Sequence, residues 1–136
     1  MFDATQYATL RAVVDCMIPA DEFPGGVQAG VDRYILHLLQ HDGAGFSPQY
    51  VAALDALQHE ALFRHQCAFA QLSLAQATAL LHALTAGDTQ AAWQVDASAW
   101  VTMVAEHCAE GFYADPRQGG NREAVAWQML GYEERR

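Results

Sequence analysis

The sequence predicts an all-α protein, an irregular bundle of five to six helices in a single domain over residues 1–136. Apolar residues recur every three to four positions in successive segments, which is the spacing of one buried helical face. No segment alternates apolar and polar residues with period two, so the sequence gives no support for strands. With 52% hydrophobic residues, the chain has enough apolar side chains for one core.

The first two predicted helices cover residues 5–18 and 27–41. Pro19 ends the first, and residues 19–26 contain too much proline and glycine to be helical, so we expect an ordered loop there. Gly43 and Gly45 end the second helix. The expected apolar faces are Tyr7, Leu10, Val14, Met17 and Ile18 in the first helix, and Val31, Tyr34, Ile35, Leu38 and Leu39 in the second.

Capping signals mark the third and fourth helices. Ser47 is the predicted N-cap of a helix that runs towards Cys67, and Pro48 suits its first turn. Ser73 and Gln76 form a capping-box pattern for the next helix, which should end at Gly87. The expected inward residues are Val51, Leu54, Ala61, Leu62 and, if the helix continues that far, Phe69 in the third, and Leu80, Leu81 and Leu84 in the fourth.

The fifth predicted helix begins near Asp96 or Ser98 and ends around residues 111–113. A tight turn over residues 115–121 follows, and Asn121 is a good cap for a short last helix that reaches Leu130. The residues of the fifth helix that we expect to face inward are Trp100, Val101, Val104 and Cys108.

Charge excludes several classes of partner. Lys and Arg total 7 against 16 Asp and Glu, so the formal net charge is −9, which disfavours both nucleic acid and anionic lipid. No apolar run approaches the roughly 20 residues that span a bilayer, so we expect no membrane insertion. Asp3 and Asp15 interrupt any signal peptide. We therefore expect a cytoplasmic protein as the sequence stands, or a periplasmic one if an export leader is missing.

Histidines and carboxylates give the only candidate metal ligands. His37 and His41 are four residues apart on the second helix, and His59, Glu60 and His65 on the third could add ligands. However, the Glu-x-x-His pair of bundle metal sites is absent, and His59-Glu60 lacks the second histidine of a zinc-protease helix. We interpret these histidines as surface residues without a metal, and a stand-alone metal-binding helical protein remains the alternative.

No other motif indicates catalysis. Glu106, His107 and Glu110 lie close together on the fifth helix, but no nucleophile accompanies them, so we expect a solvated face. The glycine pairs at 25–26 and 119–120 do not match phosphate-binding loops and are better explained by turns that need positive φ.

Three cysteines are too few and too far apart for a disulfide framework. Cys16, Cys67 and Cys108 share no Cys-x-x-Cys spacing, and each falls where a helical face could bury it. We expect small, buried free thiols. The alternative is that one of them bridges to a partner chain.

Two unusual segments remain, and both resemble one known family. They are MIPADEFPGGVQAGVDRYI over residues 17–35 and GFYADPRQGGNREAVAWQMLGY over residues 111–132. The second contains an aromatic residue, an acidic-Pro turn, Gly-Gly-Asn, a tryptophan and a final glycine. In this order the two segments resemble the N-terminal and closing motifs of the gluconate 2-dehydrogenase subunit 3 family.

The resemblance implies an accessory small subunit that has neither catalytic residues nor a cofactor of its own. Its implied partner is a large FAD-dependent dehydrogenase of the glucose–methanol–choline type, which holds the FAD and oxidises a sugar, sugar acid or polyol. A cytochrome often takes the electrons. The small subunit is implied to bind and stabilise the large one in a chaperone-like way. A free-standing regulatory domain is a further alternative.

The resemblance also implies which residues meet the partner. Asn121 would hold the closing turn while capping the last helix, and Trp127 would anchor that helix in this chain's core or in the partner. The alternative is that the loop residues of the two motifs only shape their loops. The implied interface residues are Pro19, Asp21, Pro24, Gly25, Tyr113, Asp115, Pro116, Gly119, Gly120, Asn121 and Trp127.

Overall fold

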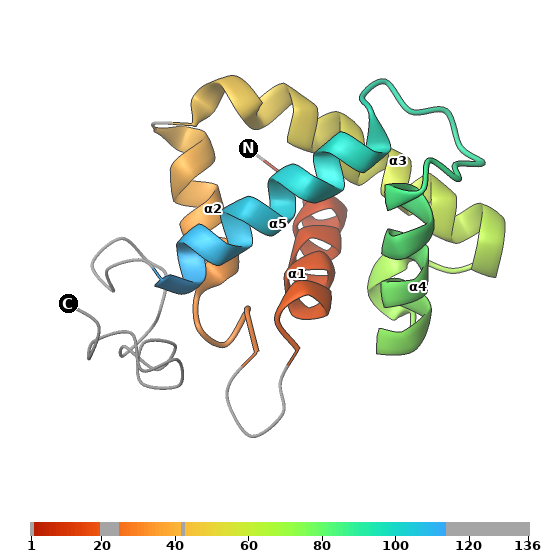
Figure 1. The fold of residues 1–136 in the computed structure, drawn as a ribbon, viewed down its shortest axis with the longest axis horizontal. Helices are drawn as coiled ribbons and strands as arrows, with labels where there is room; N and C mark the ends of the chain where they lie inside the picture. Colours follow the sequence, from red (N-terminus) through yellow and green to blue (C-terminus); the bar gives the residue numbers. More distant parts are fainter. Residues whose placement is uncertain (1, 20–24, 42, 114–136) are drawn as a thin grey trace.

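The computed structural model describes residues 2–19, 25–41 and 43–113, and these form α-helices, two short 3₁₀ helices and connecting turns. The α-helices are α1 (Ala4–Met17), α2 (Val31–Gln40), α3 (Ser47–His65), α4 (Leu74–Thr85) and α5 (Ala97–Tyr113) (Figure 1). The 3₁₀ helices are η1 (Ala44–Phe46) and η2 (Phe69–Gln71). The all-α prediction is confirmed over these residues. The predicted last helix, from Asn121 to Leu130, lies outside the described residues.

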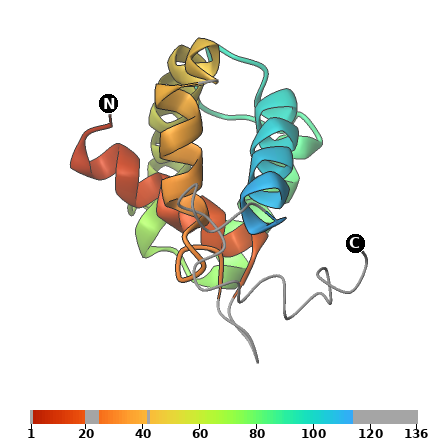
Figure 2. The same cartoon turned by 90° about the vertical axis from the view of Figure 1, so that its left-hand side faces the viewer.

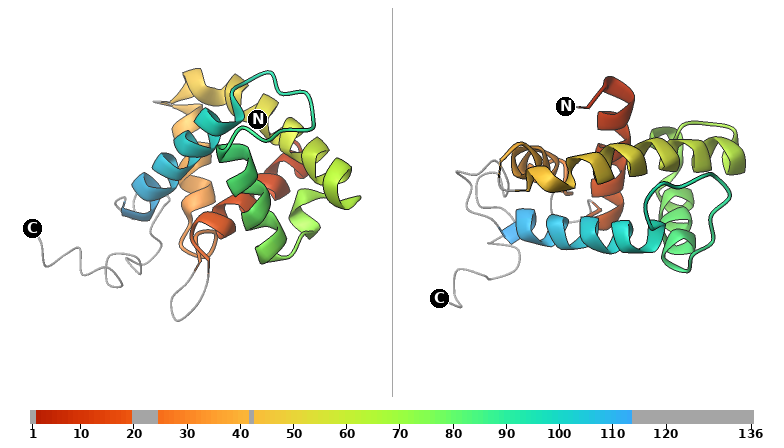
Figure 3. Two further views of the ribbon diagram at one scale, coloured as in Figure 1. Left: turned by 45° about the vertical axis from the view of Figure 1, so that its right-hand side comes forward. Right: turned by 90° about the horizontal axis from the view of Figure 1, so that it is seen from above.

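Helix α1 lies at the centre of the bundle. It contacts each of the other four α-helices, while α5 also packs against α2 and α4. Figure 2 shows α2 and α5 side by side with α1 crossing below them in this view. From above, α3 and α5 run lengthwise along the domain (Figure 3, right). One core results, and its largest fully buried side chains include Leu10, Ile35, Tyr50, Leu57, Phe69 and Leu84.

Helix α2 begins at Val31, four residues later than predicted. Residues 26–30 form hydrogen-bonded turns instead, and Gly30 at the N-cap position has φ 89°. That left-handed conformation interrupts a helix, which glycine permits because it has no Cβ. Of the predicted apolar face of α2, Val31, Ile35 and Leu39 are fully buried, whereas Tyr34 and Leu38 are half-buried.

The start of α3 corrects a prediction. Ser47 is not an N-cap: η1 leads directly into the helix, and the Ser47 hydroxyl donates to the Leu39 carbonyl over 2.9 Å. Pro48 does lie in the first turn. The serine therefore fastens α3 to the end of α2 rather than capping its own helix.

The predicted buried face of α3 is confirmed for Leu54 and Ala61, while Val51 is half-buried. Tyr50, Ala53, Leu57 and Ala61 are buried, whereas Leu62 is 45% exposed. The helix ends at His65, with Gln66 at φ 56°, and Phe69 reaches the core from η2. The polar Glu60 also occupies the buried face, and the prediction is wrong only for Leu62.

Helices α4 and α5 follow the predictions. Ser73 and Gln76 form the capping box of α4, and the backbone N–H of Ala99 donates to Asp96 Oδ1 over 3.0 Å at the start of α5. The residues predicted to face inward from both helices, Leu80, Leu81, Leu84, Trp100, Val101, Val104 and Cys108, are all buried. Across the described ranges, no helix combines the length and the apolar character required to cross a bilayer.

Candidate functional site

The N-terminal motif forms a tight turn against α1. The N–H of Gly26 donates to the Ile18 carbonyl over 2.8 Å, and the N–H of Val31 donates to the Gly26 carbonyl over 2.9 Å. A Cβ added at Gly26 would lie 2.5 Å from Val14 Cγ1. The requirement for glycine at this position is thus close packing on α1, and not the positive φ that we expected. The turn is fixed to the helix before it.

A buried carboxylate at the start of α2 also binds α1. Asp32, on the first turn of α2, is 3% exposed, and its Oδ2 accepts a hydrogen bond of 2.7 Å from the Tyr7 hydroxyl. Arg11 Nε lies 3.9 Å from the same oxygen. Burial and then Asp32 raise the pKa of Tyr7, which keeps the phenol protonated as the donor. Sequence reasoning passed over Asp32, although a charged residue inside an otherwise apolar helical face is a signal for a buried pair.

A surface groove lies beside the turn. It has a volume of about 420 Å³ and is lined by Asp15, Pro19, Gly25, Val27, Gln28 and Leu74. The Val27 N–H donates to Asp15 Oδ1 over 3.2 Å, so the groove wall is also hydrogen-bonded to α1. Leu74 is 53% exposed. Apolar surface beside one carboxylate and one amide suits a protein side chain. We call this depression the motif groove.

The two motif segments meet through α2 and α5. Tyr34, near the end of the N-terminal motif, donates a 3.3 Å hydrogen bond to Glu110 Oε1. Gly111 opens the closing motif, and a Cβ added there would lie 2.8 Å from Tyr34 Cδ2. A glycine is therefore needed for α5 to approach the tyrosine ring. Segments 76 positions apart in sequence thus lie side by side.

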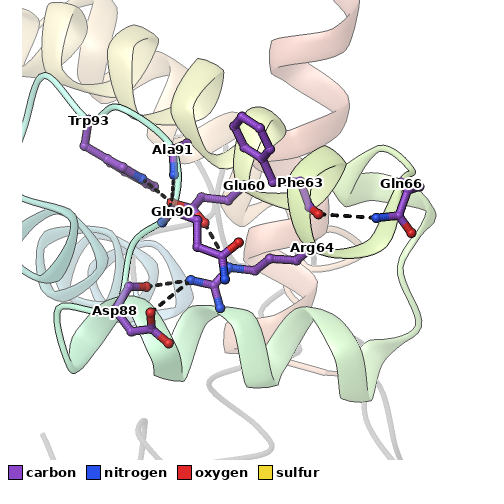
Figure 4. A network of polar contacts seen from close by, with 8 residues as sticks. All are labelled: Glu60, Phe63, Arg64, Gln66, Asp88, Gln90, Ala91 and Trp93. Atoms are coloured by element: carbon purple, nitrogen blue, oxygen red, sulfur yellow. Dashed lines mark hydrogen bonds and ion pairs between the residues drawn. The ribbon is translucent and has the colours of Figure 1, made fainter.

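A second buried carboxylate, Glu60, organises the loop between α4 and α5 (Figure 4). Its Oε1 accepts hydrogen bonds from the backbone N–H of Gln90 at 2.7 Å and of Ala91 at 2.8 Å, and from Trp93 Nε1 at 3.0 Å. Its Oε2 accepts from Arg64 Nε at 2.9 Å. Burial alone would raise the pKa of Glu60, but these hydrogen bonds outweigh it and hold the pKa below its usual value.

Arg64 extends the same network to the start of the loop. Its Nη2 donates to the Asp88 carbonyl at 2.8 Å and lies 3.4 Å from Asp88 Oδ1. Our hypothesis that Glu60 could ligate a metal from the third helix is therefore corrected. Its carboxylate is fully buried and accepts four hydrogen bonds within the protein.

His107 is also not on the solvated face that we predicted. It is 6% exposed, and its Nδ1 lies 2.6 Å from the Tyr50 hydroxyl. Burial lowers the pKa of His107, and burial raises that of Tyr50, so both are neutral near pH 7. We therefore assign the phenol as the donor and the imidazole proton to Nε2. Glu106 and Glu110 are exposed as expected.

The other histidines are more accessible. His37, His41 and His59 are exposed and His65 is half-buried, and the rings of His37 and His41 lie 4.3 Å apart. Within the described part of the chain, no three His, Cys, Asp or Glu side chains cluster closely enough to hold a metal ion. The four ligands of the alternative metal-site hypothesis are not brought together.

The cysteines are all free thiols. Cys108 is buried as expected, and burial raises its pKa to about 12. Cys16 and Cys67 are only half-buried, so the prediction of buried thiols is wrong for these two.

The structure describes three of the eleven residues implied by the motifs. Pro19 is exposed, Gly25 is buried, and both line the motif groove. Tyr113 is the last residue of α5. The remaining ones lie outside the described residues: Asp21, Pro24, Asp115, Pro116, Gly119, Gly120, Asn121 and Trp127.

Comparisons with known proteins give one result. A family model described as gluconate 2-dehydrogenase subunit 3 matches residues 4–133. No curated protein and no solved structure matches the chain.

Proposed function

Because the chain belongs to the gluconate 2-dehydrogenase subunit 3 family, we propose that it is a non-catalytic small subunit of an FAD-dependent dehydrogenase complex. In this proposal a large partner of the glucose–methanol–choline type holds the FAD and oxidises a sugar, sugar acid or polyol. The small subunit holds no cofactor. A cytochrome is the proposed electron acceptor of the complex.

The observation that carries the proposal is the meeting of the two motif segments. Tyr34 and Gly111 are in direct contact where α5 packs on α2, and the motif groove lies at the preceding turn of the same N-terminal segment. Fixing such a turn has a conformational entropy cost, and fixed surface loops commonly serve recognition.

The proposed mechanism is thermodynamic. A protein that binds the folded, FAD-loaded large subunit but not its unfolded chain stabilises the folded form by mass action. At a free concentration of 100 times Kd, this stabilisation is about 2.7 kcal/mol. The surface must also be large, since obligate interfaces often bury more than about 2,000 Å² in total.

Capture of the partner tests the proposal. A tagged chain expressed in its native host should recover a large protein with the absorption of flavin, whereas the purified chain alone should be colourless and inactive. Co-expression should raise the yield of active dehydrogenase. If the tagged chain recovers no flavoprotein, the proposal is wrong. Flavin bound to the small subunit alone would also contradict it.

A further inference from the structure

The most exposed large apolar side chain in the described part of the chain is Phe63, which is 63% exposed beside Leu62 at 45%. Both residues line a second groove with His59, Ala91 and Ala92, and its volume is about 560 Å³. We call it the Phe63 groove. Its two walls are the end of α3 and the loop between α4 and α5. The Phe63 ring stands out from α3 in Figure 4.

The wall opposite Phe63 is unusually well fixed for a loop. Ala91 is bound to the buried Glu60 through its own N–H, and Arg64 binds the loop at Asp88. Burying a carboxylate is favourable only when hydrogen bonds compensate for its lost hydration, as they do here. The network therefore keeps the groove open and shaped before any partner arrives, which lowers the entropy cost of binding.

A third depression, lined by Arg64, His65, Ala75, Gln76, Ala79 and Leu80, joins the end of α3 to the first turns of α4. Arg64 directly follows Phe63, and Ala75 directly follows Leu74 of the motif groove. Figure 3 (left) shows the end of α3 next to α4. The third depression is therefore next in sequence to both grooves, and it lies where the end of α3 faces the first turns of α4.

The negative charge of the chain indicates which kind of partner suits the Phe63 groove. The net charge of −9 opposes the pairing of two copies of this chain, and it equally opposes an anionic membrane. The cation nearest to the groove, Arg64, is already paired with Glu60 and Asp88, while the Asp88 side chain is 62% exposed. A fitting partner has an apolar side chain for the groove and basic residues around it.

We propose that the Phe63 groove is a second docking site for the large dehydrogenase subunit, which inserts an apolar side chain flanked by arginine or lysine between α3 and the loop. This inference rests on the proposed function. It adds a contact that lies outside both motif segments. An obligate interface needs such an extension, because the motif groove alone offers little apolar surface.

The test compares variants of one exposed ring in the full chain. Phe63→Asp should weaken binding to the flavoprotein that co-purifies with the wild type by about tenfold or more, as loss of a central aromatic anchor does. Phe63→Leu keeps an apolar side chain and should bind within about threefold of the wild type. Ala105→Asp, at an exposed position of α5, adds the same charge elsewhere and is the matched control.

The results that would overturn the inference are the following. Wild-type affinity in Phe63→Asp overturns the inference while leaving the proposed function intact, because the wild type still captures its flavoprotein. A melting temperature of the lone Phe63→Asp chain several degrees below that of Ala105→Asp shows that the chain itself covers the ring, and also overturns it. The inference is also overturned if the wild type sediments as a dimer and Phe63→Asp sediments as a monomer. If the wild type captures no flavoprotein, the proposed function fails first and the inference falls with it.

Discussion

At the scale of single residues, the buried polar and charged side chains of the described ranges are Thr9, Asp32, Glu60 and His107. Each has a hydrogen-bond partner: Thr9 Oγ1 donates to the Thr5 carbonyl, Asp32 accepts from Tyr7, Glu60 accepts from the loop, and His107 meets Tyr50. Two buried side-chain atoms have no hydrogen-bond partner among the described residues, Asp32 Oδ1 and Trp100 Nε1. Two of the buried side chains, Glu60 and His107, lead to measurable predictions.

Replacing Glu60 with Gln should destabilise the fold by about 2–4 kcal/mol. The neutral amide loses the ion pair with Arg64, and its NH₂ group donates where the carboxylate accepted. The measurement is urea unfolding of the lone chain. His59→Gln, at the exposed neighbouring position, is the control and should stay within about 0.5 kcal/mol of the wild type. Equal stability of the two variants would show that the network contributes nothing.

Glu60 also predicts the response to acid. Its pKa is lower in the folded than in the unfolded state, so its contribution is fully present above its ordinary value of 4.5. The contribution is lost as the pH falls below 4.5 and through the folded-state pKa. Between pH 5 and the acid limit of the fold, the stability of Glu60→Gln should therefore decline less steeply than that of the wild type. Parallel curves would contradict this assignment.

His107 predicts a loss of stability at a higher pH. Burial holds its folded-state pKa below 6.5, opposed by Glu110 and Glu106, so the unfolded chain binds the proton more readily. Its contribution is present above pH 6.5 and declines as the pH falls from 6.5 towards the folded-state pKa. His107→Gln should flatten this part of the stability curve. The exposed His82→Gln is the control, and an equal flattening by both would contradict the prediction.

At the scale of elements, the turn between α1 and α2 decides how the N-terminal motif is presented. The hydrogen bonds from Gly26 and Val31 draw residues 25–30 onto the end of α1, and Asp32 ties the start of α2 to Tyr7. The position of the motif groove therefore depends on the packing of α1 against α2 and not on the loop sequence alone.

Gly26→Ala should destabilise the chain by about 1–3 kcal/mol, because its methyl group would approach Val14 Cγ1 to 2.5 Å and the Val14 carbonyl oxygen to 3.0 Å. Gly45→Ala is the matched control, since a Cβ there meets nothing within 4 Å. A thermal melt of both variants measures the difference. If Gly26→Ala melts with the control, the turn does not pack on α1 as described.

Gly26→Ala should also lower the yield of the dehydrogenase complex if the motif groove is part of the interface. That effect should exceed the effect of a core variant outside both motif segments, Val104→Ala, which removes two buried methyl groups and should cost about 1–3 kcal/mol. If the two variants have the same stability but Gly26→Ala gives less complex, the shape of the motif groove matters for binding and not only the stability of the fold.

At the scale of the whole molecule, α1 and α5 organise the surface. Because α1 contacts every other α-helix of the described ranges, it sets the position of the turn at residues 25–30, while α5 brings Gly111 beside Tyr34. The large partner would thus meet a surface assembled from segments far apart in sequence. The formal net charge of the chain is −9, which favours a partner whose facing residues are basic.

The sequence by itself determined the helices with strong local signals. The capping box of Ser73 and Gln76 and the regular apolar spacing of α5 predicted their helices, because capping and amphipathicity depend on residues within a few positions of one another. The two motif segments indicated the family for the same reason, since they can be read along the chain.

Only the tertiary structure decided what distant residues do together. From the sequence, Glu60 was a candidate ligand, but in the structure it accepts hydrogen bonds from the loop between Gln90 and Trp93. His107 was predicted on a solvated face, but it is buried and contacts Tyr50, which is 57 positions away in the sequence. Phe63 is exposed because it lies away from the face of α3 that buries Tyr50 and Glu60. Local patterns record which face of a helix is apolar, but the energy of a buried charge depends on donors that only the fold brings within 3 Å.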